Sequence, residues 1–169
     1  MPEMVYEAAR RAAADLLRRH WDGHLPIRLS EISESLNASK YEADLGGTLS
    51  GMVSKTPGSG PRIALNSRHS SARRRFTWAH ELGHVVERKQ LADDPEYSFT
   101  DARGAKYDLH EFFADEFAGS LLIPADELRR LRNLGYTTGQ LARTFGVSVD
   151  AIDKRIARLE VHPDELAHA

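Results

Sequence analysis

Two histidines and the glutamate between them form the clearest chemical pattern in the sequence. His80, Glu81 and His84 make up the string H-E-x-x-H inside a stretch with helical periodicity. On a helix, residues four positions apart lie one above the other on the same face, so both imidazoles can bind one ion. Glu81 lies about 100° around the helix from His80 and can reach a water held by that ion. The pattern therefore predicts a metal site with an adjacent general base.

A catalytic zinc site needs a third protein ligand and an open position for water. Because the chain has no cysteine, that ligand must be a His, Asp or Glu. Glu111 is the best candidate, since it lies in a second helical stretch and Asp115 follows it one turn later. From that position Asp115 would accept the second N–H of a metal-bound imidazole and fix its tautomer. Glu116 is the rival carboxylate, but no acidic residue follows it one turn later.

The predicted ligand set of two imidazoles and a carboxylate suits Zn²⁺. Mn²⁺ binds the same atoms, and cellular supply decides between the two ions. An ion there would polarise a carbonyl and lower the pKa of its water towards about 7, while Glu81 takes the proton. We therefore expect metal-assisted hydrolysis. The alternative is that the string arose by chance on an exposed helix.

Other residues near these motifs are weaker candidates. Three could stabilise the oxyanion of a hydrolytic reaction, and the pattern does not choose among them: Tyr97, Arg103 and Tyr107. His110 points about 100° away from its neighbour Glu111, which favours a supporting or exposed position over a metal ligand. Gly83 lies inside the helical stretch at a cost of about 1 kcal/mol relative to alanine, which predicts close approach of another element.

Hydrophobic periodicity predicts the elements that position these side chains. The predicted helices cover residues 2–20, 30–36, 72–89, 108–122, 125–131, 138–145 and 149–159. Ser30 is the predicted N-cap of the second helix. Short β-like runs at 48–53 and 62–65 flank a turn rich in Gly and Pro, which predicts a small antiparallel sheet with a hairpin. The expected fold class is α+β and mainly helical.

The composition is that of an ordinary globular protein. Of the 169 residues, 41% are hydrophobic and 28% are charged, which allows a compact hydrophobic core. The formal net charge of -2 gives no general attraction to nucleic acid or anionic membranes. No stretch approaches the ~20 apolar residues of a membrane span, and the arginine-bearing N-terminal helix lacks the apolar centre of a signal peptide. We therefore expect a cytoplasmic protein with no membrane partner.

Two segments of the chain resemble the ImmA/IrrE family of metallopeptidases. The first is Arg75–His84, which contains the H-E-x-x-H string, and the second is Glu111–Pro124, which follows the family pattern E-x-x-A-x-x-F-A-x-x-L-L-x-P. The strand-like run Ile63–Asn66 also fits, and the likeness extends over most of the chain. Asp115 departs from the family, in which Asn is common at that point. The resemblance implies a zincin-like core, a minimal version of the thermolysin-like two-helix zinc site of gluzincins.

The resemblance also implies an activity. Members of this family are zinc endopeptidases that cleave a partner transcriptional repressor, usually a helix-turn-helix protein, and so relieve repression under stress. This chain would then bind zinc through His80, His84 and Glu111. The alternative is a non-catalytic regulator that binds a repressor or DNA through its C-terminal helices.

The C-terminal part of the chain resembles a helix-turn-helix unit, with a glycine turn between its last two predicted helices. Four basic residues there could meet phosphates: Arg143, Lys154, Arg155 and Arg158. Acidic residues dilute that charge, so packing on the peptidase is favoured over DNA contact, which stays open through residues 138–159. We therefore expect a zinc peptidase domain over residues 1–124 and a packed helical extension over residues 125–169.

Overall fold

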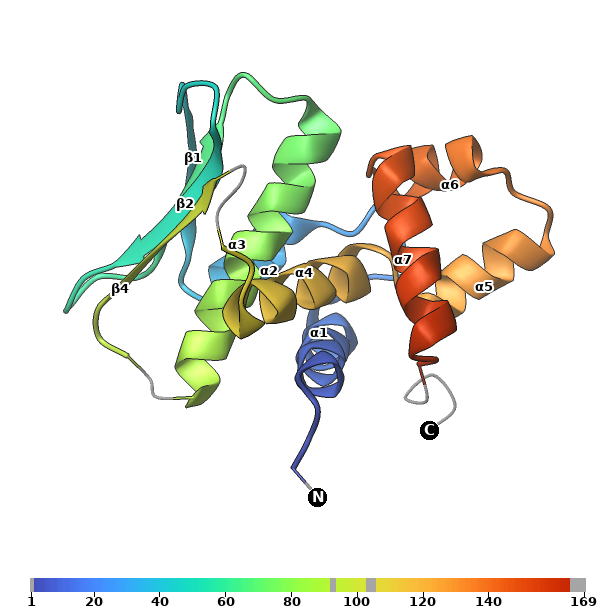
Figure 1. Ribbon diagram of the computed structural model, residues 1–169, viewed down its shortest axis with the longest axis horizontal. Helices are drawn as coiled ribbons and strands as arrows, with labels where there is room; N and C mark the ends of the chain where they lie inside the picture. The colour runs from blue at the N-terminus through green and yellow to red at the C-terminus, as the bar shows by residue number, and fades with distance from the viewer. Residues whose placement is uncertain (1, 92–93, 103–105, 165–169) are drawn as a thin grey trace.

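Seven helices and four strands make up the described part of the computed structural model, which comprises residues 2–91, 94–102 and 106–164. The helices are α1 Val5–His20, α2 Leu29–Ser35, α3 Ser71–Leu91, α4 Leu109–Leu122, α5 Ala125–Asn133, α6 Thr138–Phe145 and α7 Val149–Val161. The strands are β1 Ser39–Ala43, β2 Leu49–Lys55, β3 Arg62–Asn66 and β4 Tyr97–Ala102. The sheet and the C-terminal helices lie at opposite ends of the molecule, with α1, α3 and α4 between them (Figure 1). The predicted α+β class is confirmed.

The sheet is mixed, so the prediction of an antiparallel sheet is wrong in part. Its strand order is β1-β3-β2-β4. Strand β2 pairs antiparallel with β3 through the predicted hairpin and antiparallel with β4, whereas β1 pairs parallel with β3. Strand β3 is buried over Ile63–Asn66, while β1 is largely exposed. The most apolar strand therefore takes an interior position and separates β1 from its neighbour in sequence.

Two local predictions also fail. Strand β4 lies between the helices predicted at 72–89 and 108–122, where no element was expected, and its inward and outward residues alternate over only six positions. Helix α2 begins at Leu29 with Arg28 as its N-cap and no side-chain cap, so Ser30 lies in its first turn rather than capping it. Short elements such as these depend on tertiary contacts more than on local signals.

Helices α3 and α4 cross closely at the centre of the molecule. A Cβ atom at Gly83 would lie 2.8 Å from the Cα of Ala114, closer than real side chains approach a backbone. The predicted close approach at this glycine is therefore confirmed. Helix α1 contacts α4 from another side and contributes the fully buried Ala9 and Ala13 to the core. The crossing fixes the separation of the H-E-x-x-H segment from the start of α4.

The last three helices follow Pro124. Thr137 caps α6 in a capping box with Gln140, and Ser148 caps α7. The turn between α6 and α7 contains Gly146 with φ +68°, a left-handed conformation that favours glycine. Helix α7 returns to contact α4. Because these contacts continue across residue 124, the division of the chain there stays a prediction.

The helices of the described ranges are each too short or too polar to cross a bilayer. The cytoplasmic location stays a prediction.

Candidate metal centre

Helix α3 directs both histidines of the H-E-x-x-H string towards the first turn of α4. The Nε2 atoms of His80 and His84 each lie 3.1 Å from one carboxylate oxygen of Glu111. One ligand atom from each of the three residues falls within 4.8 Å of the other two, so this buried group could hold a metal ion. The residues that the sequence predicts as ligands therefore come together from two elements.

The start of α4 is fixed by its cap. The Asp108 carboxylate accepts hydrogen bonds of 3.0 Å from the backbone N–H groups of His110 and Glu111. An N-cap of this kind orders the first helical turn and satisfies donors that lack a partner within the helix. Glu111 therefore projects from an ordered first turn towards the two imidazoles.

Asp115 lies one turn further along α4 and bonds the first histidine. Its Oδ1 atom lies 2.8 Å from Nδ1 of His80, and its Oδ2 atom accepts a hydrogen bond of 3.0 Å from the Tyr107 hydroxyl. Although burial disfavours the imidazolium, the bond to Asp115 and the nearby Glu111 carboxylate raise the pKa of His80 well above its ordinary value. With Nδ1 bound in this way, the Nε2 of His80 faces Glu111.

Glu81 is fully buried, and neither of its carboxylate oxygens has a hydrogen-bond partner in the described part of the chain. Burial raises its pKa to about 8. The sheet leaves space for this side chain at Gly51, where an added Cβ would lie 3.4 Å from Glu81 Oε1 and 2.6 Å from Thr77 Cγ2. A buried acceptor without a partner is rare in native proteins and calls for an explanation, such as a catalytic role.

The sequence interpretation missed two residues of β4 at this site. The ring of Phe99 stacks on His84, with ring centres 4.3 Å apart. Asp101 forms a second close group with His80 and Glu81, whose ligand atoms also fall within 4.8 Å of one another. Burial raises the pKa of Asp101. The alternation of Tyr97, Phe99 and Asp101 was the available signal, since such a period places them on one face.

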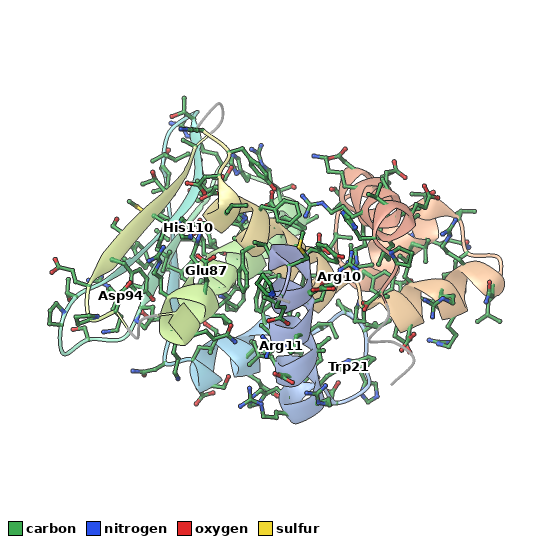
Figure 2. The ribbon with its side chains drawn as sticks, turned by 60° about the horizontal axis from the view of Figure 1, so that its bottom comes forward. Arg10, Arg11, Trp21, Glu87, Asp94 and His110 are labelled. Carbon is green, nitrogen blue, oxygen red and sulfur yellow. The ribbon has the colours of Figure 1, made fainter. Side chains whose placement is uncertain are left out.

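His110 lies beside the centre, as its position next to Glu111 predicts. Its Nδ1 is 2.7 Å from a carboxylate oxygen of Glu87, which projects from α3. Figure 2 shows His110 and Glu87 close together, with Asp94 further out. This pair connects α3 to the start of α4.

Glu116, the rival carboxylate, projects about 140° around α4 from Glu111. Its Oε1 lies 2.7 Å from Arg10 Nε and 3.4 Å from an Arg155 nitrogen, and its Oε2 lies 3.0 Å from an Arg158 nitrogen. The side chain is 2% exposed. Arg10 reaches it from α1, where that helix faces the C-terminal helices (Figure 2). Glu116 is therefore the centre of a buried ion-pair cluster and has no contact with the histidines.

The three candidates for oxyanion stabilisation have different surroundings. The Tyr107 hydroxyl donates to Asp115, and burial raises the pKa of Tyr107 to about 12, so it stays protonated. The Tyr97 ring lies 6.0 Å from that of Phe99. Arg103 lies outside the described residues. None of these contacts identifies an oxyanion donor within the described ranges.

The residues present fit a divalent metal ion. Two imidazole nitrogens and a carboxylate oxygen are the donor set of many catalytic zinc sites. The Nε2 atom of His80 is buried and makes no hydrogen bond in the ranges that the structure describes, despite its short distance to Glu111. A cation would bind the lone pair of this nitrogen and reduce the repulsion between the carboxylates of Glu111 and Glu81.

Comparisons with known proteins give a fold and a family. No curated protein matches the chain. A solved structure described as a Mycobacterium tuberculosis transcriptional regulator matches with a TM-score of 0.60 and 22% identity, over 90% of this chain and 46% of that one. The chain thus spans less than half of that protein, and the likeness shows a common fold. Residues 34–157, which include all three residues of the metal group, match the IrrE N-terminal-like domain, Peptidase_M78, so the chain belongs to the ImmA/IrrE metallopeptidase family.

Proposed function

We propose that this chain is a zinc-dependent endopeptidase that cleaves a partner helix-turn-helix repressor and so relieves repression under stress. The observation that carries the proposal is the meeting of two imidazoles and the Glu111 carboxylate beside the buried, unpartnered Glu81. Membership of a peptidase family supports hydrolysis of a peptide bond. The fold shared with a protein described as a transcriptional regulator is consistent with a role in transcription.

In this proposal His80, His84 and Glu111 would hold the ion, and Asp115 would keep His80 in the required tautomer. Zinc, or manganese in its place, would supply Lewis acidity that activates water and polarises the scissile carbonyl. Glu81 then accepts a proton from the attacking water and delivers it to the leaving amine. Burial raises the pKa of Glu81 to about 8, and a neighbouring cation would lower that pKa and favour the carboxylate that accepts the proton.

Glu81→Gln tests this assignment. The amide has nearly the same size but cannot take the proton, so we expect zinc content and fold to be kept and cleavage to fall by about 10²–10⁴-fold. The substrate for the assay is the repressor encoded nearest to the gene of this chain, incubated with and without a chelator. Fragments are measured by gel electrophoresis and mass spectrometry, and zinc by elemental analysis.

The exposed Glu96 provides the matched control, because Glu96→Gln makes the same chemical change away from the histidines. Cleavage by Glu81→Gln at the rate of the Glu96→Gln protein would show that the base is another group. Chelator-insensitive fragments would contradict the metal mechanism.

The alternative function is a regulator that binds a repressor or DNA without cleavage. Three of its four candidate phosphate contacts have acidic partners. Arg155, which is 3% exposed, and Arg158 both bond Glu116, and Lys154 pairs with Asp150 on the surface. The remaining basic face is small, which favours the peptidase. An intact repressor that co-elutes with the chain, or a salt-dependent shift of promoter DNA, would support the alternative.

The proposal divides the chain into a peptidase domain over residues 1–124 and a packed helical extension over residues 125–169, of which 165–169 lie outside the described residues. The Arg155 side chain supports packing of the extension, because its Nε donates to the Ile123 carbonyl oxygen over 3.1 Å. Through these contacts the extension would help to shape the substrate groove.

A further inference from the structure

Asp101 lies at the candidate centre without belonging to the predicted ligand set. It sits on β4, the strand at one edge of the sheet, opposite Gly51 of β2. Two residues earlier on the same face, Phe99 stacks on His84. The Asp101 carboxylate approaches within 4.8 Å of the ligand atoms of His80 and Glu81. The strand therefore places an additional negative charge beside the reacting groups.

This carboxylate has no lysine or arginine partner in the described part of the chain. The groups that act on it electrostatically are the two histidines and the carboxylates of Glu111 and Asp115, and no lysine or arginine is among them. Arg158 lies 3.9 Å from the other aspartate, Asp115. A divalent ion would balance two of the four carboxylates at the centre, and Arg158 is shared between Asp115 and Glu116. No lysine or arginine of the described residues balances the charge of Asp101.

Asp101 does not complete a second metal site with His80 and Glu81. Such a site would need a free imidazole nitrogen of His80, but Nδ1 bonds Asp115 and Nε2 faces Glu111. Glu81 is fully buried and its oxygens have no partner in the described ranges, so Glu81 and Asp101 can accept hydrogen bonds from one ligand group. Because the carboxylate of Asp101 is partly buried and has no lysine or arginine partner there, it favours a ligand group that is positively charged.

Resting on the proposed function, we propose that Asp101 binds a cationic group of the substrate beside the scissile bond. The group is a protonated amine or guanidinium, either on a lysine or arginine side chain or at the N-terminus of the substrate. A hydrogen bond between charged groups at such a site changes affinity by about tenfold or more. Asp101 would then select substrates, while Glu81 performs the proton transfer.

Binding of amino-acid hydroxamates to the zinc-loaded protein tests the proposal without knowledge of the natural substrate. Nα-acetyl-lysine hydroxamate carries a cationic side chain, leucine hydroxamate carries a free α-amine, and Nα-acetyl-leucine hydroxamate carries no cation. Titration calorimetry should show that at least one of the first two binds about tenfold more tightly than the third. Which of them gains affinity identifies the source of the cation.

Asp101→Asn should remove this preference and leave the affinity for the neutral hydroxamate within about twofold. Asp153→Asn is the matched control, because it removes the same charge from an exposed position on α7 and should keep the preference. Asp101→Ser provides a smaller second variant. Thermal unfolding and zinc content check that each protein is folded and loaded.

A wild-type protein without cation preference, or a preference that survives both substitutions of Asp101, overturns the proposal. Equal losses for the neutral and cationic hydroxamates also overturn it, because they would make Asp101 a support of the metal centre. Failure of the proposed function has a different signature, in which the wild-type protein binds neither zinc nor the neutral hydroxamate. That result would overturn both proposals together.

Discussion

Glu111 and Glu116 are two of the three carboxylates on helix α4, and their environments differ in one respect. Glu116 is fully partnered, with one oxygen between Arg10 and Arg155 and the other on Arg158. Glu111 instead belongs to a centre in which Glu81 has no partner among the described residues and the charges are predominantly negative. Burial of a carboxylate alone therefore does not mark a functional site. A functional site is marked by buried hydrogen-bond acceptors that lack partners and face one common point.

The largest effect that separates the two regions should appear in the stability of the metal-free protein. Glu116→Gln leaves three arginines, two of them buried, without their carboxylate, so the free energy of unfolding should fall by about 3–5 kcal/mol. Glu111→Gln should change it by about 1 kcal/mol or less, because that side chain is 19% exposed and better solvated. Denaturant unfolding of both variants after chelator treatment measures the difference. Equal losses would remove the distinction between the clusters.

Zinc affinity should depend on the metal centre far more than on the residues around it, in contrast to the stability of the metal-free protein. His84→Ala removes a predicted ligand and should weaken zinc binding by about 100-fold or more. His110→Ala is the matched control, because His110 bonds Glu87 rather than facing the ligand group, and it should bind zinc within a few-fold of wild type. Competition with a chromogenic chelator gives both dissociation constants. Wild-type affinity in His84→Ala would contradict the predicted ligand set.

Two glycines allow a comparison of backbone packing next to each cluster. Gly83→Ala would place a Cβ 2.8 Å from the Ala114 Cα and should cost about 1–3 kcal/mol while shifting α4 relative to the histidines. Gly119→Ala meets its nearest atom, Arg155 Cδ, at 3.6 Å and should be neutral or stabilise the helix by up to about 1 kcal/mol. Thermal unfolding distinguishes the two outcomes. A stable Gly83→Ala protein would show that the crossing can relax.

Arg158 connects the two regions. Because its side chain is 32% exposed, its loss should have the smallest effect of the changes described above. It bonds Glu116 and lies 3.9 Å from Asp115, which in turn holds His80. Arg158→Ala should weaken zinc binding by up to about tenfold, since supports of ligand histidines have effects of this order. Arg129→Ala, at an exposed ion pair, is the control and should leave zinc affinity unchanged. An unchanged affinity in both would mean that Asp115 keeps its orientation without Arg158.

The sequence predicted most helices because each has its own periodicity. It also predicted that Glu111 would meet the histidine pair, because spacing within helices and the chemistry of zinc restrict the choice. It could not predict the partners of Glu116, since Arg10 lies 106 residues away in sequence and nothing local links them. Asp101 was missed for a related reason. Its strand is short, and only pairing with β2 brings it to the centre.

Arg10 gives the first helix a structural role that lies outside the family match. The family match begins at residue 34, after α1 has ended, yet Arg10 bonds Glu116 and also donates to the His162 carbonyl oxygen over 2.7 Å. A fragment trimmed to the matched residues would lose this tie between the two ends of the chain and expose the face of α4 that α1 covers. We therefore expect the minimal cooperative folding unit to be longer than the stretch that the family match covers.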